Sequence, residues 1–470
     1  MKVRSYSESG RRRRKGITLI LTAMLLGAIL PLVGLAIDAS LLYVVKTKLS
    51  AAVDAAALAG ARSLNRGMDL ASQSANAIAT ANAFFSANFP NGHLNTANLT
   101  FTPVVAESAL RTRTVTMTAS ADAPSYFMRL LGFGATTVRA SGQASRRDVN
   151  MVLVLDRSGS MSGAMSDMTA AAIAFVDRFA EGRDNVGLIV FSNATIIAFP
   201  NPSPNGPQSN FQSANPNVDT LIGQTANGGN TSTAQALWLA YQELVKRNEA
   251  GALNLIVFFT DGLPNTVIAN FNSSTASLNL LKSTSGCTYR LQANRPMLGY
   301  ISPYSNTGQT GTNYGIVRID ADTVGSVTTS PVQTNTNNCA FRSDVSKMTT
   351  DVAKIPALDY YGNATTGYVA VTLSPANSPA QLNNASLNAA DSAVQRIRAD
   401  TNLKVVIYTL GYTGGSQPPD QTWMKRISND PTSVYYNSAY PTGLYAMSPT
   451  SAGLANAFAQ VASEILRLSM

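Results

Sequence analysis

The hydrophobic pattern of the chain begins with an uninterrupted apolar run, because Gly16 to Ile37 contain no charged side chain. At helical rise, about twenty such residues cross the hydrocarbon core of a bilayer. Lysine and arginine crowd residues 1–15, and such residues stay on the cytoplasmic side. We therefore predict a basic cytoplasmic tail, a single transmembrane helix (16–38) in the inner, cytoplasmic membrane, and a periplasmic or extracytoplasmic remainder. A cleaved signal peptide, with small residues Gly34 and Ala36, is the alternative.

Beyond this run, hydrophobic residues recur every three or four positions, which is the spacing of one helix face. The side chains of this face become small toward its end, and small residues allow another helix to approach closely. We expect the helix to continue to about Ala61. Its face would pack either against a partner helix, including that of a second copy in a homo-oligomer, or against the protein's own next domain. The face comprises Leu42, Val45, Leu49, Val53, Ala56 and Gly60.

The chain next alternates apolar and polar residues in three short segments, which predicts strands with one buried face. An alanine-rich segment, 68–89, predicts a helix before them. Residues 126–131 predict a short amphipathic helix between the last two strands. We interpret residues 39–147 as the continued helix and a small α+β module. Its predicted strands are 100–104, 112–119 and 136–144.

Two later segments, Met151–Leu155 and Leu253–Phe259, are apolar throughout. Such runs are typical of strands buried on both faces of a parallel sheet. Segments with helical spacing alternate with them, and this order predicts an α/β fold with a doubly wound sheet over residues 148–470. A further strand is predicted at 404–410 and a hairpin at 186–199. The predicted helices cover residues 165–180, 234–245, 389–397, 420–428 and 452–466.

A segment rich in Asn, Thr, Ser and Gly interrupts this alternation at about residues 265–380. Insertions of this length are usually functional surfaces or partly disordered, and we hypothesise that this one controls which partner reaches the neighbouring strand end. Both cysteines of the chain, Cys287 and Cys339, lie in it. In an exported segment such a pair suggests a disulfide worth roughly 3–4 kcal/mol. Two free thiols are the alternative.

Oxygen-bearing side chains gather where the apolar strands end. Asp156, Ser158 and Ser160 follow the first strand. Asp261 follows the second, and Thr231 lies in a loop before a predicted helix. Because ligands of open α/β sheets bind at the carboxyl ends of the strands, we expect these residues to meet. Carboxylate and hydroxyl oxygens suit a hard cation such as Mg²⁺ or Mn²⁺. The first triplet alone would also fit a cap of the following helix.

The three loops, in this order, resemble the von Willebrand factor A (vWA) family and its metal-ion-dependent adhesion site (MIDAS). The resemblance implies a binding role, in which a carboxylate of a partner protein fills the open position on the metal. It implies that hydroxyls hold the cation and that two carboxylates approach it directly or through water. These are the hydroxyls of Ser158, Ser160 and Thr231 and the carboxylates of Asp156 and Asp261.

One residue departs from the pattern of the vWA family. The family usually has threonine directly after the paired glycines, whereas Asn230 intervenes here. The spacing to the following helix favours Thr231 as the ligand, with Thr233 as a substitute. A vWA fold with a degenerate site is the alternative to metal binding.

The N-terminal region carries a second resemblance. Its basic flank, its apolar span, Asp38 and the element Val53-Asp54-Ala55-Ala56-Ala57-Leu58-Ala59 are similar to TadG-like proteins. These proteins belong to bacterial tight-adherence (Tad, or Flp) pilus assembly systems, and the resemblance covers about residues 15–62. Related pseudopilins are cut after a glycine that has Glu at the fifth position beyond it. Leu21 stands there after Gly16, so we expect no such cleavage.

Charge and motif content exclude several functions. The net charge of +9 does not indicate a nucleic-acid-binding domain, because most of it lies in residues 1–15. No nucleophile elbow surrounds the single histidine, His93, and no glycine-rich phosphate loop precedes Lys-Ser or Lys-Thr. We therefore predict that the protein is not an enzyme. A metal-dependent hydrolase, the alternative, would need Asp167 or Asp184 within reach of a metal-bound water.

Together these features predict a membrane-anchored, metal-dependent binding and assembly protein of a Tad pilus or related secretion system. Its vWA domain would engage an acidic residue of a pilus or envelope component. A surface-exposed adhesin for host or neighbouring-cell ligands is the alternative. Exposure of the insertion to protease on intact cells separates the two.

Overall fold

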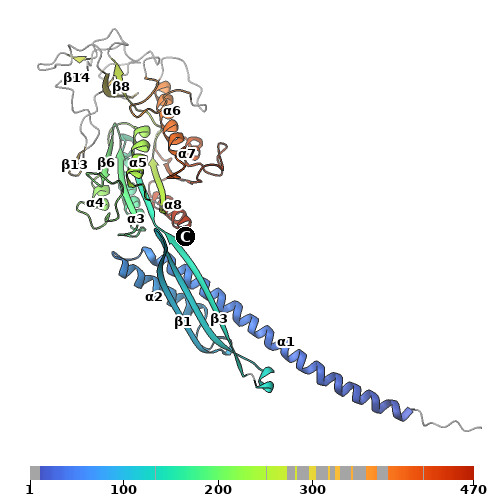
Figure 1. Cartoon of the computed structure of the whole chain (residues 1–470). Coiled ribbons are helices and arrows are strands. Elements are labelled where there is room, and N and C mark those ends of the chain that lie inside the picture. Colours follow the sequence, from blue (N-terminus) through green and yellow to red (C-terminus); the bar gives the residue numbers. More distant parts are fainter. Residues whose placement is uncertain are drawn as a thin grey trace, which may run out of the picture. The chain divides into compact units, whose positions relative to one another are not determined.

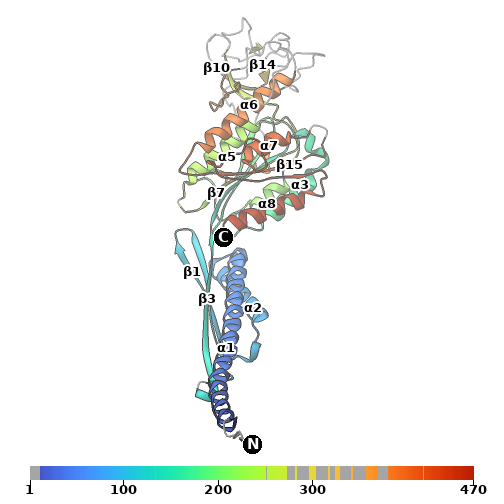
Figure 2. The same cartoon turned by 90° about the vertical axis from the view of Figure 1, so that its right-hand side faces the viewer.

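The computed structural model divides the chain into two compact units, and Figure 1 and Figure 2 label their helices and strands. The smaller unit comprises Met1–Arg66, Ala71–Ser108 and Arg113–Arg146, and the larger unit comprises Gly67–Leu70, Ala109–Thr112 and Arg147–Met470. The structure describes residues 11–132, 134–249, 251–272, 281–282, 296–302, 316–317, 323–328, 340–341, 356–367, 379–415 and 418–469.

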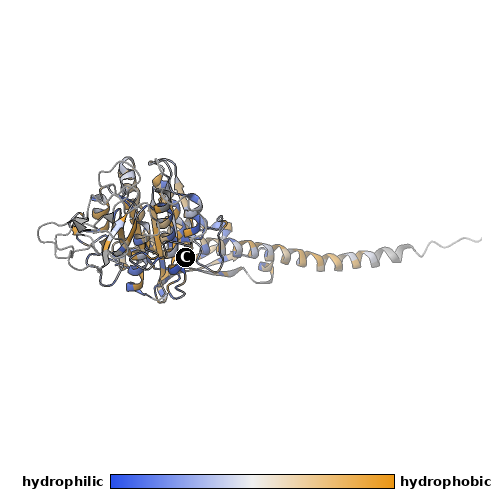
Figure 3. Cartoon of the chain, turned by 90° about the horizontal axis from the view of Figure 1, so that it is seen from above, coloured by the Kyte–Doolittle hydropathy of each residue, from blue (hydrophilic) through white to orange (hydrophobic). Residues whose placement is uncertain are grey.

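In the smaller unit, the apolar run and its predicted continuation form one uninterrupted helix, α1 (Arg11–Arg62). Its large apolar side chains from Leu19 to Ile37 are exposed, and Figure 3 shows apolar residues along this part. The most apolar window has a mean hydropathy of 2.5, and the helix is long enough to cross a bilayer. These properties are consistent with a membrane anchor or a signal sequence.

The apolar face of α1 packs on the module that follows it in the chain. Of the two alternatives expected from the sequence, a partner helix and the protein's own next domain, the structure shows the second. Phe85 of α2 and Met117 of β2 form a common core with α1 residues between Val45 and Ala57. A Cβ on Gly60 would lie 3.0 Å from Val115 Cγ1, so the close approach depends on a small residue. The three strands form an antiparallel sheet in the order β1-β2-β3. The elements are η1 (Ser63–Asn65), α2 (Leu70–Asn88), η2 (His93–Asn95), β1 (Ala97–Ala109), β2 (Thr112–Pro124), η3 (Met128–Leu131) and β3 (Ala135–Arg147).

The larger unit contains the predicted α/β sheet, with six strands in the order β16-β15-β7-β4-β5-β6. All neighbours are parallel except the β5–β6 hairpin. The central strands β4 and β7 are buried along their whole length, which explains their continuous apolar sequence. The strands are β4 (Val149–Asp156), β5 (Asn185–Phe191), β6 (Thr195–Phe199), β7 (Leu253–Thr260), β15 (Val406–Tyr412) and β16 (Tyr445–Ser448).

Helices cover both faces of this sheet, as the doubly wound prediction requires (Figure 2). Alternate residues of β4 point to opposite faces: Leu153 packs in the core with α3 and α8, whereas Val152 packs in the core with α5, α6 and α7. The helices are η4 (Gly159–Gly163), α3 (Met165–Val176), α4 (Val218–Gly223), α5 (Thr233–Arg247), α6 (Pro379–Arg398), α7 (Gln421–Ser428) and α8 (Leu454–Leu468).

Short strands occupy the described parts of the predicted insertion. β8 pairs with β10, which pairs with β11, and both pairings are antiparallel. Cys287 and Cys339 lie outside the described residues, so the disulfide stays a prediction. The strands are β8 (Val267–Asn272), β9 (Leu281–Lys282), β10 (Pro296–Ile301), β11 (Ile316–Val317), β12 (Thr323–Val324), β13 (Val327–Thr328) and β14 (Ala340–Phe341).

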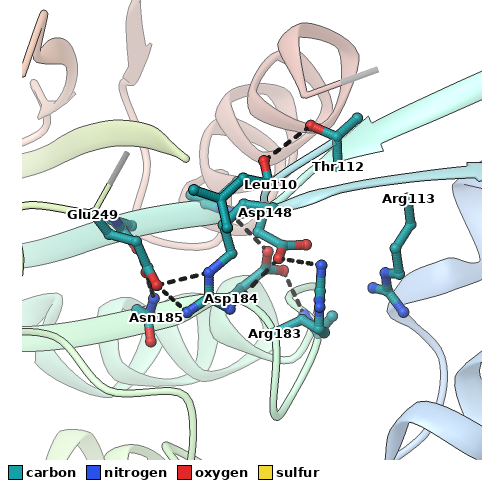
Figure 4. Close-up of polar contacts among 12 residues, drawn as sticks. Leu110, Thr112, Arg113, Asp148, Arg183, Asp184, Asn185 and Glu249 are labelled. Carbon is teal, nitrogen blue, oxygen red and sulfur yellow. Dashed lines mark hydrogen bonds and ion pairs between the residues drawn. The ribbon is translucent and has the colours of Figure 1, made fainter. Parts of the chain in front are cut away.

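Buried charges lie at the start of β4, in the larger unit (Figure 4). The fully buried Asp148 forms an ion pair with Arg183, and 2.8 Å separates Asp148 Oδ2 from Arg183 Nη2. Arg111 Nη1 lies 3.7 Å from the same oxygen, and Arg111 also pairs with Glu249. Because a buried carboxylate needs such partners, these contacts hold together the segments that frame this end of the sheet.

Candidate metal centre

The first loop of the candidate site begins where β4 ends. Asp156, the last residue of β4, is fully buried. Its Oδ1 accepts a hydrogen bond from the Ser158 backbone N–H at 2.7 Å, and its Oδ2 accepts one from the Thr260 hydroxyl at 2.6 Å. The carboxylate is therefore held in one orientation from both sides, by its own loop and by the neighbouring strand β7.

The second carboxylate, Asp261, follows β7 and is also fully buried. Its Oδ1 accepts hydrogen bonds from the hydroxyls of Ser160, at 2.8 Å, and Ser158, at 3.3 Å. The two serine hydroxyl oxygens lie 3.1 Å apart. Asp261 Oδ2 is buried and has no hydrogen-bond partner among the described residues. The structure thus brings together four of the five predicted ligands, and leaves one buried carboxylate oxygen without a donor.

The loop that carries Thr231 is attached to the first loop by backbone hydrogen bonds. The Gly159 N–H donates to Gly229 O at 3.0 Å, and the Gly228 N–H donates to Arg157 O at 2.7 Å. Thr231 is buried, in the loop directly before α5. The alternative ligand, Thr233, is the first residue of α5. Thr231 as the fifth ligand stays a prediction.

An asparagine after β7 fastens Thr231 to the Asp261 segment. Asn265 Oδ1 accepts from the Thr231 N–H at 2.8 Å, and the Asn265 N–H donates to Thr231 O at 3.2 Å. On the other side, Asn193 Oδ1 accepts from the Asn230 N–H at 2.8 Å. Both asparagines therefore fix the position of the threonine loop without belonging to the predicted ligands.

Sequence reasoning did not find these supporting residues. Thr260 lies beside Asp261, but its hydroxyl turns to Asp156 on the neighbouring strand. Asn193 and Asn265 act on a loop more than thirty positions away in the sequence. The only nearby sequence feature that pointed to these contacts was the pair of glycines before Asn230. Gly229 has a φ of +83°, and a Cβ there would lie 2.8 Å from the Asn193 side chain.

Burial and mutual repulsion disfavour negative charge at this site. Burial, and then the negative charge of Asp261, raise the pKa of Asp156 from its ordinary 3.8 to about 7. Hydrogen bonds from Thr260 and Ser158 only partly offset this effect. Burial also raises the pKa of Asp261, against the hydrogen bonds from Ser160 and Ser158. Two adjacent carboxylates in this environment need a proton or a cation between them.

The donor set fits a hard divalent cation. It offers only carboxylate and hydroxyl oxygens, which suit Mg²⁺ or Mn²⁺, and the unpartnered Asp261 Oδ2 is a ready ligand. The described residues contain no group of three or more His, Cys, Asp or Glu that could hold a metal ion, here or elsewhere. A cation held here would therefore rest on two carboxylates and neighbouring hydroxyls.

Asn265→Ala is expected to weaken Mg²⁺ binding by roughly 10–100-fold, because the Thr231 loop loses its fastening although no ligand is removed. The matched control is Asn270→Ala, which truncates an exposed asparagine on β8 and should leave the affinity unchanged. Calorimetric titration of both variants checks this. Equal affinities would show that Asn265 does not position the site.

Of the two aspartates that a hydrolase would need, Asp184 lies at the opposite end of β4 from this site. Asp184 Oδ1 accepts from the Val149 N–H at 3.0 Å, and its Oδ2 accepts from the Ala180 N–H at 2.7 Å. Val149 begins β4, whereas Asp156 ends it, which separates the two positions by roughly 20 Å of extended strand. Asp167 lies in the first turn of α3 with an exposed side chain. Neither observation favours the hydrolase alternative.

Comparisons with protein families agree with both resemblances. Residues 16–63 match the family described as putative Flp pilus-assembly TadE/G-like. Residues 150–286 match the von Willebrand factor type A domain. The chain thus combines a TadE/G-like N-terminal region with a vWA domain, which is consistent with a TadG-like Flp pilus assembly protein. No curated protein matched the chain.

Several solved structures align with the chain at low similarity. The PilB minor pilin from Streptococcus sanguinis aligns at 12% identity over 80% of each chain, with a TM-score of 0.36. The pilus adhesin SpaC from Lactobacillus rhamnosus GG aligns at 12% identity, over 79% of this chain and 35% of SpaC, with a TM-score of 0.36. The vWF domain of the type V pili tip protein Mfa5 from Porphyromonas gingivalis aligns at 14% identity, over 70% and 98% of the two chains, with a TM-score of 0.35. Scores this low do not identify a shared site or function.

Proposed function

We propose that this chain is a single-pass, metal-dependent binding and assembly protein of a Tad (Flp) pilus or related secretion system. Its vWA domain binds a protein partner of the pilus or envelope through a carboxylate of that partner. The two matched families, which are typically non-catalytic, support a binding role over an enzymatic one.

The observation that carries the proposal is the state of Asp261. Its carboxylate is fully buried, lies beside a second buried carboxylate, and has an oxygen without a donor among the described residues. Such an arrangement is unfavourable by itself, because buried charges require partners. It is favourable when a cation is held between the two groups.

Each residue of the site has a distinct part in this proposal. A bound Mg²⁺ or Mn²⁺ supplies positive charge and an open position for the partner's carboxylate. Thr260 and the Ser158 N–H keep Asp156 oriented, and their hydrogen bonds favour its ionised form. The hydroxyls of Ser158 and Ser160, which now donate to Asp261, have lone pairs to offer when their hydrogens turn away.

The exposed apolar part of α1 supports the location that we propose. It anchors the chain in the inner membrane, with the N-terminus in the cytoplasm and the chain beyond Asp38 outside it. The vWA domain then meets pilus or envelope components on the extracytoplasmic side.

The test is pilus assembly in cells that carry Asp261→Asn in place of the wild-type chain. This change removes the proposed metal ligand's charge at nearly constant volume. Loss of a buried charge pairing with the partner corresponds to about 2 kcal/mol or more, or roughly thirtyfold weaker binding, so surface pili should largely disappear. Asp167→Asn, which neutralises an exposed aspartate on α3, is the matched control and should leave pili unchanged.

Normal pilus numbers in the Asp261→Asn strain, at an unchanged protein level in the membrane fraction, would contradict the proposal. Protease added to intact cells separates it from the adhesin alternative. A periplasmic chain stays uncut, whereas cleavage between residues 265 and 380 would favour a surface adhesin.

A further inference from the structure

Three large apolar side chains are exposed together at the turn between β2 and β3. Tyr126 is 54% exposed, Phe127 is 42% exposed and Leu130 is 84% exposed. We name these three residues the apolar tip. They lie around η3, within the smaller unit and outside both regions that match known families. Clustered apolar side chains at one exposed turn commonly mark a contact with a membrane or a partner.

The apolar tip is fastened to α1 by a buried carboxylate. Asp38 is 1% exposed and accepts three backbone hydrogen bonds from the turn. Its Oδ1 accepts from the Tyr126 N–H at 2.9 Å. Its Oδ2 accepts from the N–H groups of Phe127, at 2.9 Å, and Met128, at 2.7 Å. The free N–H groups at the start of η3 are thereby satisfied, and the tip cannot move independently of this turn of α1.

A glycine lets the tip lie directly on α1. A Cβ on Gly34 would come within 2.5 Å of Phe127 Cγ and Cδ1, so any larger residue would displace the ring. Gly34 lies one helical turn before Asp38 on the same face. The two residues together fix both the backbone and the aromatic ring of the tip.

This attachment point lies at the end of the exposed apolar part of α1. The unbroken run of exposed large apolar side chains ends at Ile37, three residues after Gly34, which is roughly 5 Å at helical rise; Tyr43 and Val44 are exposed beyond it. If α1 spans the membrane, the Phe127 ring lies at the boundary between the hydrocarbon and the headgroups. Tyrosine is enriched at this level, and a long cationic side chain such as that of the exposed Arg129 can reach lipid phosphates from it.

We propose that the apolar tip docks into the extracytoplasmic interface of the same bilayer that α1 spans. The occupant of the exposed surface is thus phospholipid, at the junction of acyl chains and headgroups. The reason is that the tip packs against α1 at Gly34, close to the end of the exposed apolar run at Ile37. The tip therefore extends the apolar surface that α1 presents to the bilayer. This inference rests on the membrane anchor of the proposed function. Its consequence is that the smaller unit touches the membrane at two points, which fixes its orientation.

The experiment measures quenching of added tryptophans by lipids with brominated acyl chains, with the full chain in nanodiscs. Leu130→Trp reports on the tip. Met24→Trp reports on α1, where Met24 is 72% exposed, and Val104→Trp on β1, where Val104 is 51% exposed, is the matched control. The native Trp238 and Trp423 both lie in the larger unit, so wild-type emission serves as the background.

Brominated lipids should quench the indoles added at positions 130 and 24 and leave that at position 104 unchanged. Quenching at position 24 without quenching at 130 overturns the inference and leaves the anchor intact. In that case, red-shifted emission from position 130 indicates a tip in water, and blue-shifted emission indicates burial against protein, such as a second copy. Absence of quenching at position 24 overturns the anchor itself and, with it, the inference.

Discussion

Asp261→Asn is expected to stabilise the metal-free protein at neutral pH and to abolish its response to Mg²⁺. In the wild-type chain, burial and then the negative charge of the neighbouring Asp261 raise the pKa of Asp156 to about 7. Asparagine keeps the shape and the Oδ1 acceptor for Ser160 but removes one charge. Since one unit of pKa corresponds to about 1.4 kcal/mol, relief of this repulsion should add on the order of 1–2 kcal/mol to the free energy of unfolding.

The stabilisation that Mg²⁺ gives to the wild type should be absent in the variant. At a Mg²⁺ concentration one hundred times its dissociation constant, the wild type should gain about 2.7 kcal/mol, whereas the variant should gain nothing. Unfolding of the larger unit can be followed by the fluorescence of Trp238 and Trp423, in EDTA and in Mg²⁺. Asp167→Asn serves as the control. A variant that is less stable in EDTA, or that gains as much from Mg²⁺ as the wild type, would contradict the prediction.

The same pair of carboxylates predicts the sign of the pH dependence. The pKa of Asp156 is about 7 in the folded chain and 3.8 without the burial and repulsion. Between these values the folded chain holds a proton that the unfolded chain has lost, so metal-free stability should fall as the pH rises from about 4 to 7. Mg²⁺ competes with that proton, so its affinity should rise over the same interval. The pH dependence of metal-free stability should be smaller in Asp261→Asn.

Arg183→Met is expected to destabilise the larger unit by about 3–5 kcal/mol without changing metal affinity. The substitution leaves Asp148 fully buried and without its 2.8 Å partner, and removing one member of a buried ion pair is far costlier than losing an exposed one. The pair lies at the start of β4, whereas Asp156 ends the strand, so the metal centre should be unaffected. Denaturant unfolding followed by the native tryptophans measures the loss.

The matched control is Arg467→Met, which removes an ion pair with Glu464 at the surface and should change the stability little, because water screens exposed charges. The double variant Arg183→Met with Asp148→Leu should regain part of the lost stability, because no unpaired charge remains. A loss for Arg183→Met as small as that for Arg467→Met would show that Asp148 does not depend on Arg183.

Helices and strands with a clear hydrophobic pattern within their own residues were predictable from the sequence. β4 and β7 are buried on both faces, and their apolar runs showed this directly. β1, in contrast, extends beyond the predicted 100–104 at both ends, because its half-buried residues alternate only from Leu99 to Val105 and the residues at its ends are exposed. Helix α6 begins at Pro379, ten residues before the predicted start, in sequence too polar to show a helical face.

The candidate site was predictable to the extent that its residues adjoin strand ends. Asp156 and Asp261 follow neighbouring parallel strands, so their meeting follows from the sheet order. The contacts that support the site or fasten the turn are between residues far apart in the chain. Asn265 fastens Thr231, and Asp38 accepts hydrogen bonds from a turn almost ninety positions later. No pattern within a short window encodes such pairs.

The central claim is that Asp156, Ser158, Ser160, Thr231 and Asp261 hold a divalent cation. It is tested most directly by calorimetric titration of Mg²⁺ and Mn²⁺ into the full chain in detergent, beside the Asp261→Asn variant. We predict saturable binding of one ion per chain to the wild type and none to the variant. No binding to the wild type, or equal binding to both proteins, would contradict the account and leave a vWA fold whose partner is recognised without a metal.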